Sequence, residues 1–167
     1  MNFKSYIVLI LILFLSRDII AQKKTTTIHI LNADKADYDE RLGKDIQRLI
    51  GNVVMRQDST YFYSDSAYYN EKTKFFDGFG NVHIEVNDST DIYSDLLKYN
   101  GNTKFAELFH NVVLKDDSTT LRTEYMTYDR VGHLATYPNK GTITRNDKKL
   151  VSKKGYNAKL VSGKNTY

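Results

Sequence analysis

The sequence predicts an all-β protein, an antiparallel β-jellyroll or flattened solenoid built from repeats of about 30 residues. Similar segments begin at Asn52, Asn81 and Asn111, so the block starts are 29 and 30 residues apart. Within each segment apolar and polar residues alternate, which is typical of a half-buried strand. The composition agrees, because one proline and 13 tyrosines among 167 residues favour strands over linkers. No segment predicts a helix of useful length.

The chain is expected to consist of a signal peptide, residues 1–21, and one repeat domain, residues 22–167. Lys4 precedes ten apolar residues in a row, and Ala21 offers a small residue for cleavage. Ten residues suit a signal peptide, whereas a membrane-spanning helix needs about 20. An uncleaved signal anchor is the alternative. The chain ends partway through a repeat, so we expect either a fragment truncated at its C-terminus or an edge that docks another jellyroll.

Each repeat is interpreted as two strands and two turns. In the second repeat, residues 82–86 alternate as one strand, and residues 91–99 form a longer second strand. Residues 87–90 and 100–103 are turns, since Asn, Asp, Ser and Gly bond or bend the backbone locally. A weaker copy begins near Gly141, and a half-copy precedes the repeats at residues 33–39. By alignment with the other copies, residues 41–50 are also expected to be strand.

The second strand of every repeat changes face at the same place. Its first half puts Phe62, Ile92 and Leu121 on one parity, together with Ser64, Ser94 and Thr123. Its second half has apolar residues on the opposite parity: Ala67, Leu97, Met126, Tyr69, Tyr99 and Tyr128. A recurrent flip predicts a bulge at which the strand passes from one layer of a two-layer structure to the other. The small Ser and Thr residues would lie where the layers come closest.

Composition and motifs argue against several classes of function. The net charge is only +4, which disfavours nucleic-acid binding. The chain has no cysteine, which disfavours a disulfide-stabilised extracellular module. The four histidines have no partner at metal-ligand spacing. The pair Asp-Ser at 58, 88 and 117 recurs at one turn, which indicates turn chemistry rather than catalysis. We therefore expect no enzyme activity, no metal and no cofactor.

The repeated motifs resemble the OstA/LptA family (organic solvent tolerance-like, also seen in the N-terminal domain of LptD), and the Bacteroidetes-type OstA-like proteins in particular. The resemblance rests on recurrent Asn-Val-x-Leu/Ile/Met and Ser/Ala-Asp-x-x-x-Tyr-Asn/Asp segments, such as Asn81–Ile84 and Ser94–Asn100, over residues 28–160. It implies a periplasmic lipopolysaccharide-binding component of transport to the outer membrane, with acyl chains in the apolar interior. It also implies head-to-tail edge-strand pairing with other Lpt-type jellyroll proteins or with itself. The expected location is the periplasm, with an association with the outer membrane as a further expectation.

The residues expected to line the lipid groove are the inward apolar positions of the first layer: Val53, Met55, Phe62, Val82, Ile84, Ile92, Val112, Leu114 and Leu121. The same alternation would also build a closed core. The alternative function is therefore a structural or adhesive cell-envelope β-solenoid without a lipid groove. Four lysines are further candidates to contact lipid phosphates near the rim: Lys72, Lys74, Lys104 and Lys115.

Overall fold

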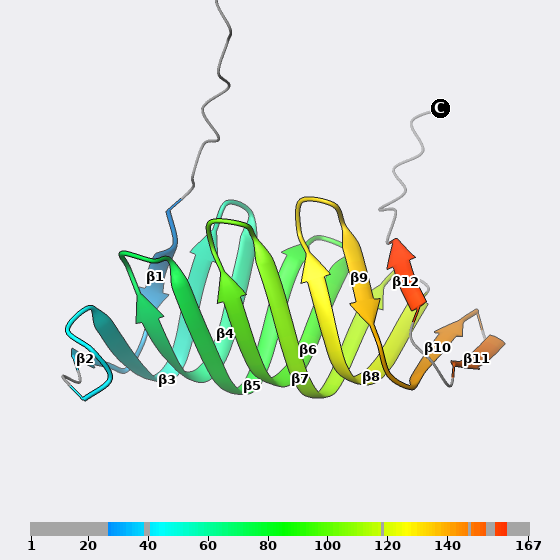
Figure 1. The fold of residues 1–167 in the computed structure, drawn as a ribbon, viewed down its shortest axis with the longest axis horizontal. Coiled ribbons are helices and arrows are strands. Elements are labelled where there is room, and N and C mark those ends of the chain that lie inside the picture. The colour runs from blue at the N-terminus through cyan, green and yellow to red at the C-terminus, as the bar shows by residue number, and fades with distance from the viewer. Residues whose placement is uncertain (1–26, 39–40, 118, 147, 153–155, 160–167) are drawn as a thin grey trace, which may run out of the picture.

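The computed structural model describes residues 27–38, 41–117, 119–146, 148–152 and 156–159, and within these the chain forms twelve strands of one antiparallel sheet (Figure 1). The expected signal peptide lies outside the described residues. The strands are β1 (His29–Asn32), β2 (Lys35–Tyr38), β3 (Ile46–Gln57), β4 (Thr60–Asn70), β5 (Phe75–Asn87), β6 (Thr90–Asn100), β7 (Phe105–Asp116), β8 (Thr119–Asp129), β9 (Leu134–Tyr137), β10 (Gly141–Arg145), β11 (Lys148–Ser152) and β12 (Tyr156–Lys159).

The sheet is folded lengthwise into two facing walls, because every long strand bends near its middle (Figure 1). The register shifts at each bend, for example between Tyr63 and Ser66 on β4 and between Phe109 and Val112 on β7. Wall A contains residues 53–57, 60–64, 82–87, 90–94, 112–116 and 119–123 with β1, β10 and β11. Wall B contains residues 46–50, 66–70, 75–79, 96–100, 105–109 and 125–129 with β2, β9 and β12. The predicted all-β jellyroll and its recurrent bulge are confirmed.

A hydrogen-bonded clamp at each bend explains the Asp and Asn of the repeated motif. The Asn81 amide donates to Asp65 at 2.9 Å, and the pairs Asn52–Asp34 and Asn111–Asp95 repeat this contact at 3.0 and 2.7 Å. The asparagines adopt a left-handed backbone with φ between 46° and 51°, a conformation that Asn tolerates better than most residues. The motif therefore encodes the bend that makes two walls out of one sheet.

The loops between strands explain the remaining motif positions. At the wall B end, Asn100 Oδ1 accepts hydrogen bonds from the backbone N–H of Asn102 and Thr103. Asn70 and Asp129 cap the equivalent loops in the same way. The Asn-Gly pair thus begins a four-residue loop rather than a two-residue hairpin.

Small side chains bring the walls together beside the bend. Ser64 and Ser94 each donate a hydrogen bond to a backbone carbonyl two residues further on, Ser66 and Leu96. A Cβ added at Gly78 of wall B would lie 3.5 Å from Ser64 Oγ. The predicted close approach of the layers at these small residues is therefore confirmed.

The strand expected at residues 41–50 is wrong in its first half. Residues 41–45 form turns, and the strand begins at Ile46. Gly43 has a φ of 126°, which a strand does not use. The matching segments of later repeats also begin with turns, at residues 71–74 and 101–104, so the same alignment favours a turn here. Among the described residues, none belongs to a helix that is long and apolar enough to cross a membrane.

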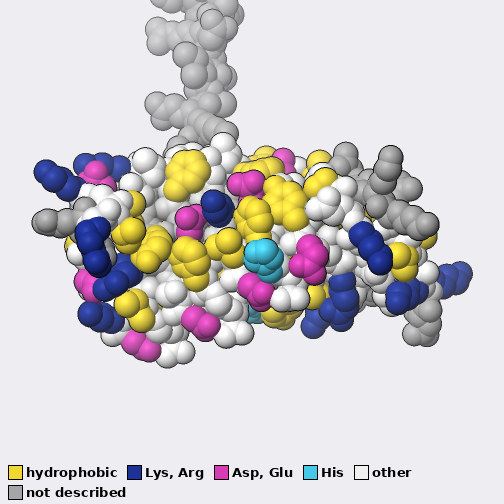
Figure 2. All heavy atoms as spheres, turned by 60° about the horizontal axis from the view of Figure 1, so that its bottom comes forward, with side chains coloured by type: hydrophobic (Ala, Val, Ile, Leu, Met, Phe, Trp, Pro, Cys, Tyr) yellow, Lys and Arg dark blue, Asp and Glu magenta, His cyan; other side chains and the backbone are white. Residues whose placement is uncertain are grey.

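The outer surface of wall A carries a row of rings across three strands. Tyr63 of β4 stacks on His83 of β5 with centroids 5.2 Å apart, and His83 stacks on Tyr93 of β6 at 4.5 Å. Lys115 lies 5.1 Å above the Tyr93 ring. Such cross-strand pairs stabilise a sheet face. Figure 2 looks mainly onto the bends rather than onto this face, and shows apolar side chains interrupted by acidic and polar groups, with Lys and Arg gathered towards the two ends.

Candidate functional site: the space between the walls

The nine side chains predicted to line a groove all lie on the inner face of wall A. Each is 0–3% exposed, and all belong to one apolar cluster. They reach this face because alternate residues of a strand point to the same side. The structure therefore brings the whole predicted set together between the walls. Their contact with lipid stays a prediction.

Wall B supplies an equally apolar inner face that the site prediction omitted. Its buried side chains are Leu49, Ala67, Tyr69, Phe76, Leu97, Tyr99, Ala106, Leu108, Met126, Tyr128, Ala135 and Tyr137. The signal was present in the sequence, because the phase flip places the apolar residues after each bend on the facing layer. Phe62 of wall A packs against Phe76 and Tyr99 of wall B, with ring centroids 5.1 and 4.7 Å apart. The walls thus fill the space between them.

Buried polar side chains of wall A lie at the two margins of the space between the walls. Ser94 and Thr123 lie at the bend, whereas Gln57, Thr60 and Thr90 lie beside the loops at the opposite margin. We call this loop margin the mouth. Burial also raises the pKa of the phenols of Tyr99 and Tyr128, on wall B, to about 12. Between these margins wall A presents an apolar strip along the length of the sheet.

Four side chains cross the mouth and join the walls, and we call them the latch: Gln57 and Asp58 from wall A, Lys104 and Arg130 from wall B. Lys104 Nζ lies 2.7 Å from Asp58 Oδ2. Gln57 Nε2 donates to the carbonyl of Gly101 at 2.9 Å. Arg130 Nη1 donates to Gln57 Oε1 at 3.2 Å, and Nη2 donates to the Gln57 carbonyl at 3.3 Å. The latch therefore holds the middle of the mouth closed.

Ile28 adds an apolar contact to the closed mouth. It is 4% exposed, and its Cδ1 would lie 2.6 Å from a Cβ added at Gly101. Gly101 itself belongs to the β6–β7 loop of wall B, while Ile28 precedes β1 of wall A. The contact needs a glycine at residue 101, because a side chain there would displace Ile28.

Of the four lysines proposed for the rim, three belong to loops along the mouth: Lys72 and Lys74 to the β4–β5 loop and Lys104 to the β6–β7 loop. Lys104 belongs to the latch. Lys72 pairs instead with Asp45 at 2.7 Å, and Lys115 lies over Tyr93 on the outer face. Sequence reasoning missed Gln57, Asp58 and Arg130. Asp58 has no distinguishing signal, because it stands in the same Asp-Ser-Thr segment as Asp88. Only the fold shows that Asp58 faces two cations of the opposite wall.

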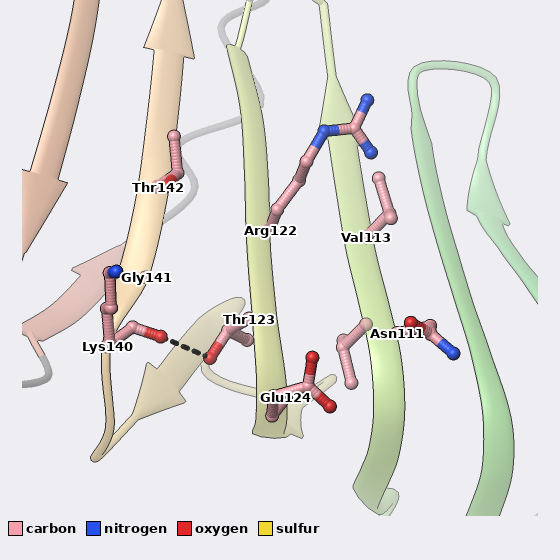
Figure 3. A pocket seen from close by; sticks show the side chains of 9 residues that line it. Asn111, Val113, Arg122, Thr123, Glu124, Lys140, Gly141 and Thr142 are labelled. Carbon is pink, nitrogen blue, oxygen red and sulfur yellow. Dashed lines mark hydrogen bonds between the residues drawn. The ribbon is translucent and has the colours of Figure 1, made fainter.

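Hollows also occur outside the walls. One of about 550 Å³ lies beside the bend of β7, β8 and β10, lined by Arg122, Thr123, Glu124 and Lys140 among others (Figure 3). Thr123 Oγ1 donates to the Lys140 carbonyl at 3.1 Å within it (Figure 3). No group of three or more potential metal ligands occurs in the part of the chain that the structure describes. Within the described residues, this hollow therefore offers no metal site.

Comparison with known proteins gives a family and a fold. A family model described as "OstA-like protein" matches residues 25–164. A crystal structure of LptH from Pseudomonas aeruginosa, described as the LptA homologous periplasmic component of the lipopolysaccharide transport device, is similar with a TM-score of 0.53. The two chains are 18% identical, and the match covers 62% of this chain and 76% of LptH. No curated protein matches the sequence.

Proposed function

The chain belongs to the OstA-like family, and from this premise we propose that it is a periplasmic lipopolysaccharide-binding component of transport to the outer membrane. In this proposal the acyl chains lie between walls A and B. The observation that carries it is the pair of facing apolar strips, which extend over β3 to β8 and form one cluster. The fold that the chain shares with LptH supports the proposal.

The energetics favour binding with easy release. A ~12-carbon acyl chain gains roughly 10 kcal/mol when its methylenes leave water, at about 0.8 kcal/mol each. The walls already bury each other, so a lipid replaces wall-to-wall contacts and the net gain is smaller. Equivalent repeats make successive positions along the strip similar in free energy. A chain can then move along the space without meeting one deep trap.

A second candidate is a structural or adhesive envelope solenoid with a permanently closed core. The observation in its favour is the closed interior, since the nine predicted residues are at most 3% exposed and the latch joins the walls. Both candidates use the same apolar alternation. They differ in whether the walls separate for a ligand.

The partners in the proposal are lipopolysaccharide, through its lipid A acyl chains, and further jellyrolls at the two ends of the sheet. β1 at one end and β11 at the other are terminal strands of the sheet path. Both expose apolar side chains, including Leu31 at 48% and Leu150 at 59%. Exposed edges of this kind can pair with a strand of another chain. This supports head-to-tail assembly with Lpt-type jellyrolls or with a second copy.

The experiment that tests the proposal is photo-crosslinking to purified lipopolysaccharide. A photoreactive residue is placed in turn at Ile84, Ile92 and Leu114, which are at most 1% exposed. The matched control is Glu85, which lies on the same strand as Ile84 but on the outer face, where it accepts a hydrogen bond from Tyr63. Circular dichroism verifies that each variant keeps its β content.

Adducts at the three inner positions, and none at Glu85, are the expected result. Folded variants that give no adduct at the inner positions would overturn the lipid-carrier proposal and leave the closed solenoid. Labelling at Glu85 as strong as at Ile84 would place the lipid on the outer surface instead.

A further inference from the structure

The latch contains a buried cation whose hydrogen bonding is incomplete. The Arg130 side chain is 8% exposed, and its Nε is buried with no hydrogen-bond partner among the described residues. Its guanidinium lies over the rings of Phe62 and Tyr99, 5.8 and 5.9 Å from their centroids. Burying a guanidinium is costly unless acceptors surround it. Arg130 therefore lies at the mouth, beside the apolar interior, and its Nε can donate one more hydrogen bond.

One carboxylate faces both cations of the latch. Asp58 Oδ2 lies 2.7 Å from Lys104 Nζ but 3.8 Å from Arg130 Nη2. The contact with Lys104 is thus the tighter one, and the contact with Arg130 exceeds hydrogen-bond length. Asp58 is on the wall opposite to both cations. Whatever replaces Asp58 on the cations removes the ion pairs between the walls and leaves the neutral hydrogen bonds of Gln57 as the remaining contacts of the latch.

A hollow adjoins these three groups. It measures about 340 Å³ and is lined by Asp58, Ser59, Thr60, Val86, Lys104, Arg130, Val131 and His133. Val86 is a buried residue of the apolar cluster, so the hollow borders the space between the walls. Two cationic side chains, the hydroxyl groups of Ser59 and Thr60 and an apolar floor are therefore found at one place.

We propose that this hollow binds the phosphate headgroup of an acylated amphiphile, with Lys104 and Arg130 as its ligands, and that the phosphate displaces Asp58. A phosphate has several oxygens, so it can accept hydrogen bonds from the guanidinium of Arg130 and the ammonium of Lys104 at the same time. The carboxylate of Asp58 lies close to Lys104 but beyond hydrogen-bond length from Arg130. Displacement of Asp58 breaks the ion pairs across the mouth. The headgroup thereby opens the entrance through which its own acyl chain passes. This inference rests on the proposed function and names the headgroup chemistry of that same site.

The test compares two lipids that differ only in phosphate, 1-lauroyl lysophosphatidic acid and 1-lauroylglycerol, below their micelle concentrations. Binding to the whole chain is measured by isothermal titration calorimetry. Inorganic phosphate alone is the third ligand, because it distinguishes a lipid headgroup site from a site for free phosphate. The variants are Lys104→Gln and Asp58→Asn. The matched control is Lys35→Gln, which removes a surface ion pair with Asp37, 3.2 Å long, on β2.

The original chain is expected to bind the phosphate lipid about tenfold more tightly than the neutral one, in line with charge-assisted hydrogen bonds. Lys104→Gln should reduce that ratio to about two to threefold. Asp58→Asn should raise the affinity for both lipids, since it removes the group that competes for the cations and joins the walls. Lys35→Gln should leave the ratio unchanged.

Each other outcome overturns a distinct claim. Equal binding of both lipids by the original chain and by Lys104→Gln would overturn the headgroup site while leaving the proposed function intact. Weaker phosphate-lipid binding by folded Asp58→Asn would overturn displacement of Asp58. Inorganic phosphate binding as tightly as the phosphate lipid would show a free-anion site without acyl coupling. Binding of neither lipid, even by Asp58→Asn, would overturn the proposed function itself.

Discussion

The middle of the molecule and its C-terminal end use the same repeat but differ in closure. From β3 to β8 the inner residues are buried and the latch joins the walls. At the end, β10 and β11 diverge from β9 and β12 (Figure 1). Leu150 and Val151 of β11 are 59% and 48% exposed. A hollow of about 460 Å³, lined in part by Ile143 and Leu150, lies between β10 and β11.

The difference lies in the bend. In the middle each bend is a bulge inside one continuous strand, fixed by an Asn–Asp clamp. At the end, Glu124 stands where the other repeats have Asp, and residues 138–140 separate β9 from β10. Pro138 lacks a backbone N–H and cannot continue the ladder there. Clamp and latch together hold the two walls closed in the middle of the molecule, and the walls separate at the end where both are missing.

Truncating one leucine in each region is expected to give the largest difference between the middle and the end. Leu108→Ala in the middle is expected to lower the free energy of unfolding by about 3 kcal/mol, because Leu108 is fully buried and leaves a cavity. Leu150→Ala at the end should change it by less than about 0.5 kcal/mol. Urea denaturation followed by circular dichroism measures both. Equal losses would show that the end is packed as tightly as the middle.

Alkaline unfolding probes the buried tyrosines of the middle. Burial raises the pKa of Tyr99 and Tyr128 to about 12, from an ordinary value of 10.0, although Arg130 opposes this shift. The unfolded chain therefore releases these protons at lower pH than the folded chain. Stability is retained below pH 10 and falls between about pH 10 and 12, by about 2 kcal/mol for each tyrosine. Denaturation across this range, with ultraviolet titration of tyrosinate, provides the measurement. A stability that stays level up to pH 12 would contradict the burial.

The bend clamp is tested on β5 with two glycines of the same strand. Gly80→Ala should cost about 1.5 kcal/mol, because φ is 70° and the new Cβ would lie 2.4 Å from Asp65 Oδ2. Gly78→Ala is the control, since its Cβ would make only ordinary contacts of 3.5 Å or more. Urea midpoints compare them. The clamp account fails if Gly80→Ala is no more harmful than Gly78→Ala.

The smallest expected effect is a gain. His110 occupies, with a φ of 62°, the bend position that Gly51 and Gly80 fill in the two preceding copies. His110→Gly should stabilise the chain by about 0.5 kcal/mol, because the left-handed strain outweighs the added chain entropy. Differential scanning calorimetry would record a higher Tm. A lower Tm would mean that the His110 side chain contributes more than its backbone strain costs.

The sequence was sufficient to predict what repeats. Alternation in residues 82–86 identified strands, and the shared parity change after Ser64 and Ser94 identified the bend. Every predicted groove residue reached the interior, since strand periodicity alone determines its side of the sheet. The inner face of wall B could also be predicted, because the parity change places the apolar residues after each bend on the facing layer.

What occurs once could not be predicted in the same way. The contact of Arg130 with Gln57 joins residues 73 positions apart, and no local pattern encodes it. Asp58 and Asp88 share the segment Asp-Ser-Thr, and the sequence does not show that Asp58 faces two cations of the opposite wall. Repeats predict the walls, whereas contacts between the walls come from the three-dimensional arrangement.

The most direct test of the central claim, that the walls separate at the mouth to admit acyl chains, is to lock the mouth. The chain has no cysteine, so Ser59→Cys with His133→Cys gives a unique pair whose two positions line one hollow on opposite walls. A bismaleimide with a reducible disulfide joins the two thiols. Lipopolysaccharide labelling by a photoreactive residue at Ile92 is then measured before and after reduction. We expect the locked chain to lose labelling and the reduced chain to regain it, whereas equal labelling in both states would contradict entry through the mouth.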